Sequence, residues 1–304
     1  MRQALKSAPP MAQLAFLILT GFVAMSALAG LYTVVLALGG IDVRFLGNLS
    51  LVVDPFGIEA RSLKVLQVAQ ALGLFVVPYV LYRWLLDQPT YSLRLKASNW
   101  PMFLVFGITM VASLPMINFL AEWNMGLTLP EALSSVQSWI EAREKDVERL
   151  LEVFLVMETP WHLIMNLVLI AFIPAVSEEL MFRGTLQPLV FRMVRNEHVA
   201  IWLTAFLFSF FHMQFLGFFP RMLLGAVFGY AAHWSGSLFL TKVGHLINNG
   251  VAVLIAYFIG IEALNPDVET LGANEGQWMV ALLSCLVLLV GMYAVKRRST
   301  HISQ

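Results

Sequence analysis

The chain has 304 residues, of which 59% are hydrophobic and only 12% are charged, whereas charged residues make up about 25% of an average soluble protein. This composition excludes an ordinary water-soluble globule and predicts a polytopic membrane protein. Nineteen basic residues balance nineteen acidic ones, so no net positive charge is available to neutralise nucleic-acid phosphates, and we expect no nucleic-acid partner.

Apolar runs of about 20 residues, the length that crosses a bilayer, occur eight times in the sequence. The predicted spans are residues 12–38, 65–84, 101–123, 161–182, 199–216, 218–234, 243–261 and 278–295. The basic residues Arg2, Lys6, Arg83, Arg94, Lys96, Arg192, Arg195, Lys242, Lys296, Arg297 and Arg298 fall on alternating connections. Because positive residues gather on the cytoplasmic side, both termini are predicted to be cytoplasmic.

The first predicted span has a second interpretation. Arg2 and Lys6, the apolar run and the small-residue triplet Ala27-Leu28-Ala29 together resemble a secretory signal with its cleavage site. The apolar region of a signal ends after about 7 to 15 residues, but this run continues to Leu38. We therefore favour an uncleaved membrane anchor.

Residues 130–157, between the third and fourth spans, are polar but patterned. Apolar side chains recur at steps of three, four or seven, at Leu133, Val136, Ile140, Val147, Leu151 and Phe154, which is typical of an amphipathic helix. We favour a helix on the outer membrane interface with its charged face in water, and a role in gating substrate entry is the alternative. The expected fold is all-α: a single domain over residues 1–304, a bundle of about eight transmembrane helices with one interfacial helix.

Three groups of polar residues interrupt the apolar spans, where one charge costs about 2.5 to 3.5 kcal/mol. The fourth span contains Glu178, Glu179 and Arg183. Side chains four residues apart face one another on a helix, so Glu179 can pair with Arg183, whereas Glu178 points elsewhere. A weakly solvated carboxylate takes up a proton more readily, which makes Glu178 the candidate base. A buried ion-pair network that braces the helices is the alternative.

The other two groups supply imidazoles and carboxamides. His212 lies in the fifth span and, taken alone, would be a core histidine bonded to a backbone carbonyl. His245 and Asn249 share one helical face, and both side chains can donate hydrogen bonds to a developing oxyanion. Asn248 can face the same way, so helical geometry leaves both asparagines open. A polar contact between helices is the alternative.

Together these residues resemble the CPBP family, which contains the CAAX proteases and the bacteriocin-processing membrane proteases. The motifs are EExxxR at Glu178, Glu179 and Arg183, FxxxH at Phe208 and His212, and HxxxN at His245 and Asn249. The resemblance covers about residues 161–261, the expected catalytic half, and it implies Asn249 rather than Asn248 as the functional asparagine.

The resemblance implies an intramembrane endopeptidase whose site opens toward the cytoplasm. Glu178 and His212 would hold and deprotonate a water molecule, His245 and Asn249 would bind the oxyanion, and Glu179 and Arg183 would support them. The expected partners are a peptide or membrane-protein substrate and the lipid bilayer. The expected location is a bacterial plasma membrane, and the oligomeric state stays open.

We favour catalysis without a metal or other cofactor. Zinc held by Glu178, His212 and His245 is the alternative, but the sequence has no HExxH, and the carboxamide of Asn249 is not a usual zinc ligand. The same polar network would also suit an ion relay in a transporter, or a silent scaffold for a partner helix. The sequence has none of the repeats typical of transporters.

Several further residues are expected to be structural. The histidines His162, His198, His233 and His301 lie near predicted membrane interfaces, where a histidine costs little. The single cysteine, Cys285, excludes an internal disulfide framework. Gly225 and Gly229 form a GxxxG pattern in the sixth span, which predicts close packing of that helix against a neighbour.

Overall fold

The computed structural model describes residues 2–86, 100–260, 272 and 276–300. All regular structure in these ranges is helical, which confirms the predicted all-α class. The predicted cytoplasmic residues Arg94 and Lys96, and the terminal His301, lie outside the described residues.

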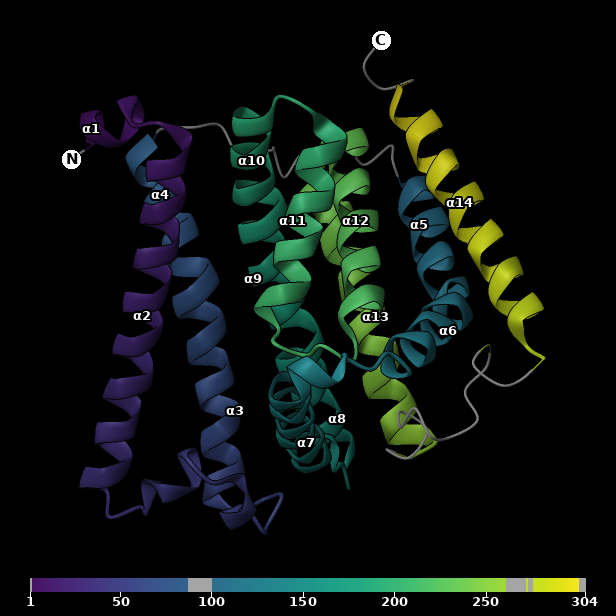
Figure 1. The fold of residues 1–304 in the computed structure, drawn as a ribbon. Coiled ribbons are helices and arrows are strands. Elements are labelled where there is room, and N and C mark those ends of the chain that lie inside the picture. Colours follow the sequence, from purple (N-terminus) through teal and green to yellow (C-terminus); the bar gives the residue numbers. More distant parts are fainter. Residues whose placement is uncertain (1, 87–99, 261–271, 273–275, 301–304) are drawn as a thin grey trace.

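Fourteen α-helices and several short segments make up the described chain (Figure 1). The α-helices are α1 (Arg2–Ser7), α2 (Pro10–Leu38), α3 (Ile58–Ala71), α4 (Val77–Leu86), α5 (Trp100–Ala112), α6 (Leu114–Met125), α7 (Ser134–Leu155), α8 (Pro160–Asn166), α9 (Ile173–Met181), α10 (Gln187–Val194), α11 (Glu197–Phe211), α12 (Phe218–Ser235), α13 (Leu238–Phe258) and α14 (Trp278–Thr300). Short 3₁₀ turns are η1 (Val43–Leu46), η2 (Leu49–Leu51) and η5 (Glu131–Leu133). Three π-helical segments, η3 (Leu72–Val76), η6 (Leu167–Phe172) and η7 (Phe182–Leu186), join successive α-helices into longer rods.

Five rods in the described ranges are long and apolar enough to cross a membrane: Pro10–Leu38, Ile58–Leu86, Pro160–Val194, Leu238–Phe258 and Trp278–Ser299. A sixth forms if α5 and α6, which meet at a bend of 41°, are counted as one span. The predicted count of eight is not reached, because α11 has only 15 residues and α12 does not meet the same criterion. These apolar rods indicate an integral membrane protein.

The fourth predicted span, residues 161–182, is shorter than the rod that the structure shows. The helix continues through η7 and α10 to Val194. Gly184 lies inside this rod, and a Cβ atom there would lie 3.0 Å from Cδ1 of Leu238 on α13. This glycine therefore allows close helix packing instead of ending the helix, and Glu178 lies near the middle of the rod.

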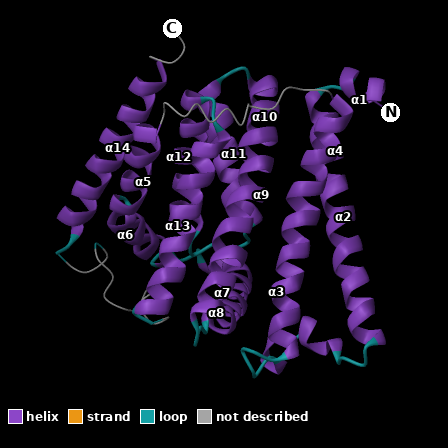
Figure 2. Cartoon of the chain, turned by 180° about the vertical axis from the view of Figure 1, so that it is seen from behind, coloured by secondary structure: helices purple, strands orange, loops and turns teal. Residues whose placement is uncertain are grey.

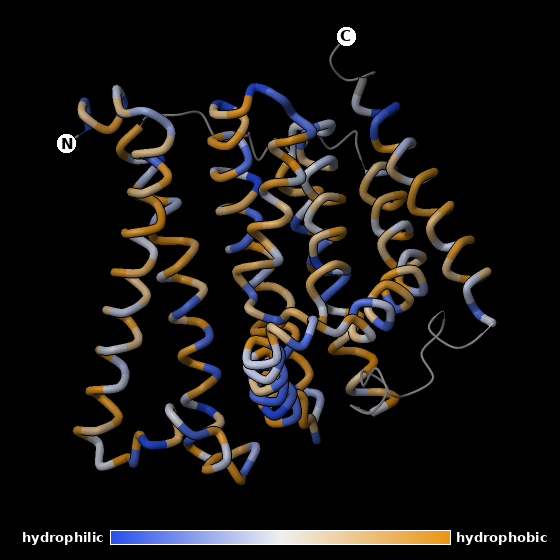
Figure 3. Tube along the Cα trace, viewed as in Figure 1, coloured by the Kyte–Doolittle hydropathy of each residue, from blue (hydrophilic) through white to orange (hydrophobic). Residues whose placement is uncertain are grey.

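The rods form three side-by-side groups (Figures 1 and 2). α2 with α3 and α4 lies on one side, α9 to α13 lie in the centre, and α5, α6 and α14 lie on the other side. α7 runs across the direction of the rods and is seen nearly end-on in Figure 1. Figure 3 shows that α7 is largely hydrophilic whereas most of the rods are hydrophobic. A helix covers most of the predicted amphipathic segment.

Close packing between α11 and α12 depends on the two glycines of the GxxxG pattern, as predicted. A Cβ atom on Gly225 would lie 3.1 Å from the Cα of Ala205, and one on Gly229 would lie 2.8 Å from Cγ2 of Ile201. The carbonyl oxygen of Gly229 also accepts a hydrogen bond of 3.1 Å from Nε2 of Gln187. The two helices are therefore held at a separation that tolerates no side chain at these positions.

We expect Gly229→Ala to destabilise the folded protein by about 1 to 3 kcal/mol, because the added methyl group overpacks the α11–α12 contact. Unfolding of the detergent-solubilised protein, followed by circular dichroism, measures this change. Gly30→Ala on α2 is the matched control, since a Cβ atom there meets nothing within 4 Å. Equal stability of the two variants would contradict the packing role of Gly229.

Candidate active site

The ion pair predicted within the fourth rod is present. Nη1 of Arg183 lies 2.7 Å from Oε1 of Glu179, and the side chains are 1% and 0% exposed. The second terminal nitrogen, Nη2, donates to the carbonyl oxygen of Gly225 on α12 at 2.8 Å. A buried charge needs both a counter-ion and hydrogen bonds, and Arg183 has both. The pair therefore ties the α9 rod to α12.

Phe208 of the FxxxH motif packs against this buried charge. Its ring centroid lies 4.5 Å from the guanidinium carbon of Arg183, and 5.1 Å from the ring of Phe182. The ring of Phe228 covers the guanidinium at 5.4 Å. An aromatic face attracts a cation when water is excluded, so the phenylalanine of the motif shields the ion pair in addition to preceding His212 by one helical turn.

His245 on α13 joins the same cluster through Glu179. Nδ1 of His245 lies 3.1 Å from Oε1 of Glu179, and its ring stacks on Phe228 with centroids 5.3 Å apart. An ionised carboxylate only accepts hydrogen bonds, so this contact assigns a proton to Nδ1. Nε2 then faces Glu178, with 3.9 Å between Nε2 and Oε2 of that residue. Glu179 therefore both neutralises Arg183 and orients His245.

His212, at the end of α11, is oriented by the backbone. Its Nδ1 lies 2.8 Å from the carbonyl oxygen of Phe208. Since a carbonyl only accepts, Nδ1 is the donor and Nε2 points away from the helix. Nε2 lies 3.8 Å from Oε2 of Glu178. The bond to a backbone carbonyl is the one expected of a core histidine, but the second nitrogen faces the candidate base.

Glu178 is the point on which the two imidazoles converge. The residue is 8% exposed, and among the described residues its Oε2 atom has no hydrogen-bond partner. The distances of 3.8 and 3.9 Å to the two Nε2 atoms exceed direct hydrogen bonds. Gaps of this size between polar groups are suited to a bridging water molecule.

Asn249 lies on the same helix as His245 but has other partners. Its Nδ2 donates to the carbonyl oxygen of Ile170 in η6 at 3.2 Å, and its Oδ1 accepts from Asn248 at 3.2 Å. None of the hydrogen bonds or ion pairs in the described part of the chain joins Asn249 to Glu178, His212 or His245. The structure thus brings Glu178, His212 and His245 together. It connects Asn249 to η6, in the same rod as Glu178.

Arg221 is a charged neighbour that the motifs did not single out. It lies in the first turn of α12, donates to the carbonyl oxygen and the Oε1 atom of Gln214 at 3.1 and 2.5 Å, and interacts electrostatically with Glu178. The sequence contained one signal for it, since an arginine stands within the apolar residues 218–234. An intramembrane charge of this kind suggests a functional site.

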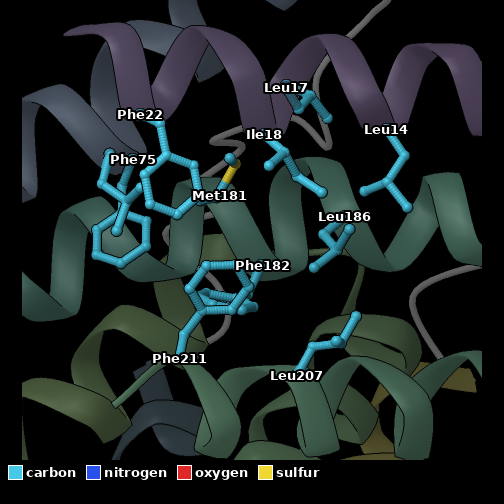
Figure 4. Close-up of a pocket in the computed structure, with 11 residues that line it drawn as sticks. Leu14, Leu17, Ile18, Phe22, Phe75, Met181, Phe182, Leu186, Leu207 and Phe211 are labelled. Atoms are coloured by element: carbon cyan, nitrogen blue, oxygen red, sulfur yellow. The ribbon is translucent and has the colours of Figure 1, made fainter. Parts of the chain in front are cut away.

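An apolar pocket, shown in Figure 4, shares Phe182 with this cluster, because the ring of Phe182 packs against the ring of Phe208. Its lining comes from α2, η3, the α9 rod and α11, and consists of Leu14, Leu17, Ile18, Phe22, Leu74, Phe75, Met181, Phe182, Leu186, Leu207 and Phe211. Phe211 directly precedes His212, and Met181 lies less than one turn after Glu178 on the same rod. Because every residue of the lining is apolar, the pocket suits an apolar group, and its position in the sequence places that group near Glu178 and His212.

The bundle consists mainly of apolar helices, and carboxylate, imidazole and guanidinium groups gather inside it. These groups define a polar intramembrane site. Residues 160–251 match one family, described as type II CAAX prenyl endopeptidase Rce1-like. This segment is Rce1-like, which confirms the resemblance drawn from the three motifs. No curated protein and no solved structure matched the chain.

Proposed function

We propose that the protein is an intramembrane endopeptidase of the CAAX-protease type, with Glu178 as its general base. The observation that carries this proposal is the convergence of two Nε2 atoms, from His212 and His245, on the buried Oε2 of Glu178. The three groups come from three separate helices. Membrane segments carry ionisable groups rarely, and a cluster of three is typical of a functional site.

In the proposed reaction, Glu178 and His212 hold a water molecule between Oε2 and Nε2. Glu178 accepts a proton from this water as its oxygen attacks the carbonyl carbon of the scissile amide. The proton then passes from Glu178 to the leaving amine, so that the carboxylate is regenerated. Phe208 holds the ring of His212 in place, because its carbonyl fixes Nδ1 as the donor.

His245 and Asn249 are the proposed donors to the oxyanion. Nδ1 of His245 already donates to Glu179, so donation from Nε2 requires that the ring carries both protons. Asn249 uses one N–H for Ile170, and the second N–H of its amide is the proposed donor. One such donor contributes about 3 to 4 kcal/mol in well-studied hydrolases. The peptide substrate lies in or at the membrane, and its apolar part would enter the pocket of Figure 4.

We also propose that all eight predicted spans cross a bacterial plasma membrane, with both termini in the cytoplasm. α1 and the end of α14 lie at the same end of the bundle (Figure 1), as an even number of crossings requires. α7 lies toward the opposite end, which supports an outer interfacial position for it. The basic residues Arg192, Lys296 and Arg297 belong to the end of the bundle that holds the termini.

Catalysis is proposed to need no metal. In the described ranges no three His, Cys, Asp or Glu side chains are grouped so that they could hold a metal ion. The residues that zinc would use in the alternative are Glu178, His212 and His245.

We expect cleavage to persist after the purified protein is treated with a strong zinc chelator, because the water is activated by Glu178 itself. Elemental analysis of the same preparation checks the metal content. Stoichiometric zinc, with activity that is lost on chelation and restored by added zinc, would overturn the metal-free mechanism and leave the peptidase assignment intact.

The assignment as a peptidase is tested by comparing protein termini in membranes from two cell populations. One population carries the wild-type protein and the other carries Glu178→Gln. Protein termini that are present with the wild type and absent with the variant would identify both the substrates and the cleavage preference. Identical sets of termini, with both proteins present in equal amounts, would contradict the proposal.

A further inference from the structure

The loop that follows His212 is held in place by side chains from other helices. Residues 213–217 join α11 to α12, and Met213 adopts a left-handed conformation with φ of 54°. The chain therefore reverses direction directly after the candidate catalytic histidine. A short loop with few hydrogen bonds of its own leaves its backbone polar groups in need of partners.

Two of these partners come from α6 and α12. Asn124 on α6 is 3% exposed, donates from Nδ2 to the carbonyl oxygen of Phe215 at 3.0 Å, and accepts from the N–H of Phe219 at 2.8 Å. Arg221 on α12 bonds the carbonyl oxygen and the side chain of Gln214. Asn124 thus connects the loop to α6, and Arg221 connects it to α12.

The third partner is Glu144 on the amphipathic helix α7. Its Oε1 accepts a hydrogen bond of 2.9 Å from the N–H of Leu216. Glu144 is half-buried, whereas the charged residues around it on α7, such as Lys145 and Glu148, are exposed. A second contact lies one turn earlier, where the rings of Trp139 and Phe215 have centroids 5.6 Å apart. α7 therefore contacts the loop with both an acceptor and an aromatic ring.

We propose that Glu144 is a positioning residue for His212, through which the amphipathic helix controls the geometry of the active site. The carboxylate holds Leu216, four residues after the histidine, and also interacts electrostatically with Arg221, which interacts in the same way with Glu178. Its loss releases the loop at this point, so that Nε2 of His212 moves relative to Oε2 of Glu178. This inference rests on the proposed peptidase function, because the effect is exerted on the catalytic histidine.

The test compares three variants of the full chain in detergent micelles or vesicles. Glu144→Ala is expected to lower kcat about 10- to 100-fold with little change in KM, because displacement of a reacting group by about 1 Å has effects of this size. Glu144→Gln keeps an oxygen that can accept from Leu216, and should recover most of the lost kcat. Glu148→Ala, one turn further along the exposed face of α7, should behave as the wild type.

A second measurement does not depend on activity. In hydrogen–deuterium exchange, peptides that cover residues 213–219 should exchange faster in Glu144→Ala than in the wild type or Glu148→Ala. Unchanged exchange in this segment, or a kcat for Glu144→Ala equal to that of the wild type, would overturn the positioning role. If Glu178→Gln is inactive while Glu144→Ala is fully active, only the positioning role fails. If Glu178→Gln still cleaves, the proposed mechanism fails, and the exchange result still decides whether Glu144 holds the loop.

Discussion

Glu178→Gln is expected to lower peptide-bond hydrolysis by at least about 100-fold, the lower end of what a general base contributes. The amide that replaces the carboxylate cannot accept a proton from water at neutral pH, although it has nearly the same shape. Initial rates of cleavage of a substrate found by the terminus comparison, with purified protein in vesicles, measure the effect.

The fold should survive this substitution, because Oε2 of Glu178 has no hydrogen-bond partner among the described residues and the ion pair of Glu179 is unaffected. Thermal unfolding of the variant is the control for this point. Glu148→Gln, at an exposed position on α7, is the control for removal of a carboxylate as such. A Glu178→Gln protein that retains the wild-type rate would rule out the assigned base.

Glu179→Gln is expected to destabilise the protein by about 3 to 5 kcal/mol, because it leaves the fully buried charge of Arg183 without a counter-ion. The loss should appear as a lower midpoint in denaturant unfolding of the solubilised protein. The exposed pair of Arg143 and Asp146, with 3.6 Å between Nη1 and Oδ2, is the matched control. Asp146→Asn should change the free energy of unfolding by less than about 1 kcal/mol.

A double substitution separates stability from activity at this pair. Glu179→Leu together with Arg183→Met replaces both buried charges by apolar side chains, which often recovers most of the stability. Activity should stay low, because Nδ1 of His245 no longer has the carboxylate that orients it. Wild-type stability of Glu179→Gln alone, or full activity of the double variant, would contradict the two roles assigned to Glu179.

The features that were predicted correctly can be recognised from residues that lie close together in the sequence. Glu179 and Arg183 are four residues apart, so any helix places them side by side, and the structure shows them 2.7 Å apart. The helical rods follow from the apolar runs for the same reason, since run length and composition are local properties. The close approach at Gly225 and Gly229 follows from the absence of side chains at these two positions.

The contacts that were missed join segments far apart in the chain. Glu179 and His245 are separated by 66 residues, and no helical periodicity shows which face of α9 meets α13. The contacts of Asn124 and Glu144 with the His212 loop likewise join residues that are 91 and 72 positions apart. These contacts are determined by the way the helices pack against one another, and the periodicity of a single helix does not predict that packing.

The ends of the elements were the least predictable part of the fold. The fourth span was predicted to end at residue 182, yet the rod continues to Val194. Fewer than eight rods are long and apolar enough to cross a membrane in the described ranges, in part because the helix that precedes His212 ends at Phe211, which leaves α11 with 15 residues.

The wide turn η6, which precedes α9, determines the direction in which the acidic pair faces relative to the start of the rod. A π turn holds one residue more than the regular helix can accommodate in phase. If η6 (Leu167–Phe172) relaxed to an ordinary α-helical winding with the same residues, everything beyond it would rotate by about 100°. Glu178 and Glu179 would then face lipid or another rod in place of the two imidazoles. The direction in which the two acids face is therefore encoded by a backbone irregularity, and a chain of equal length with the same motif but a regular α turn in place of η6 would aim them differently.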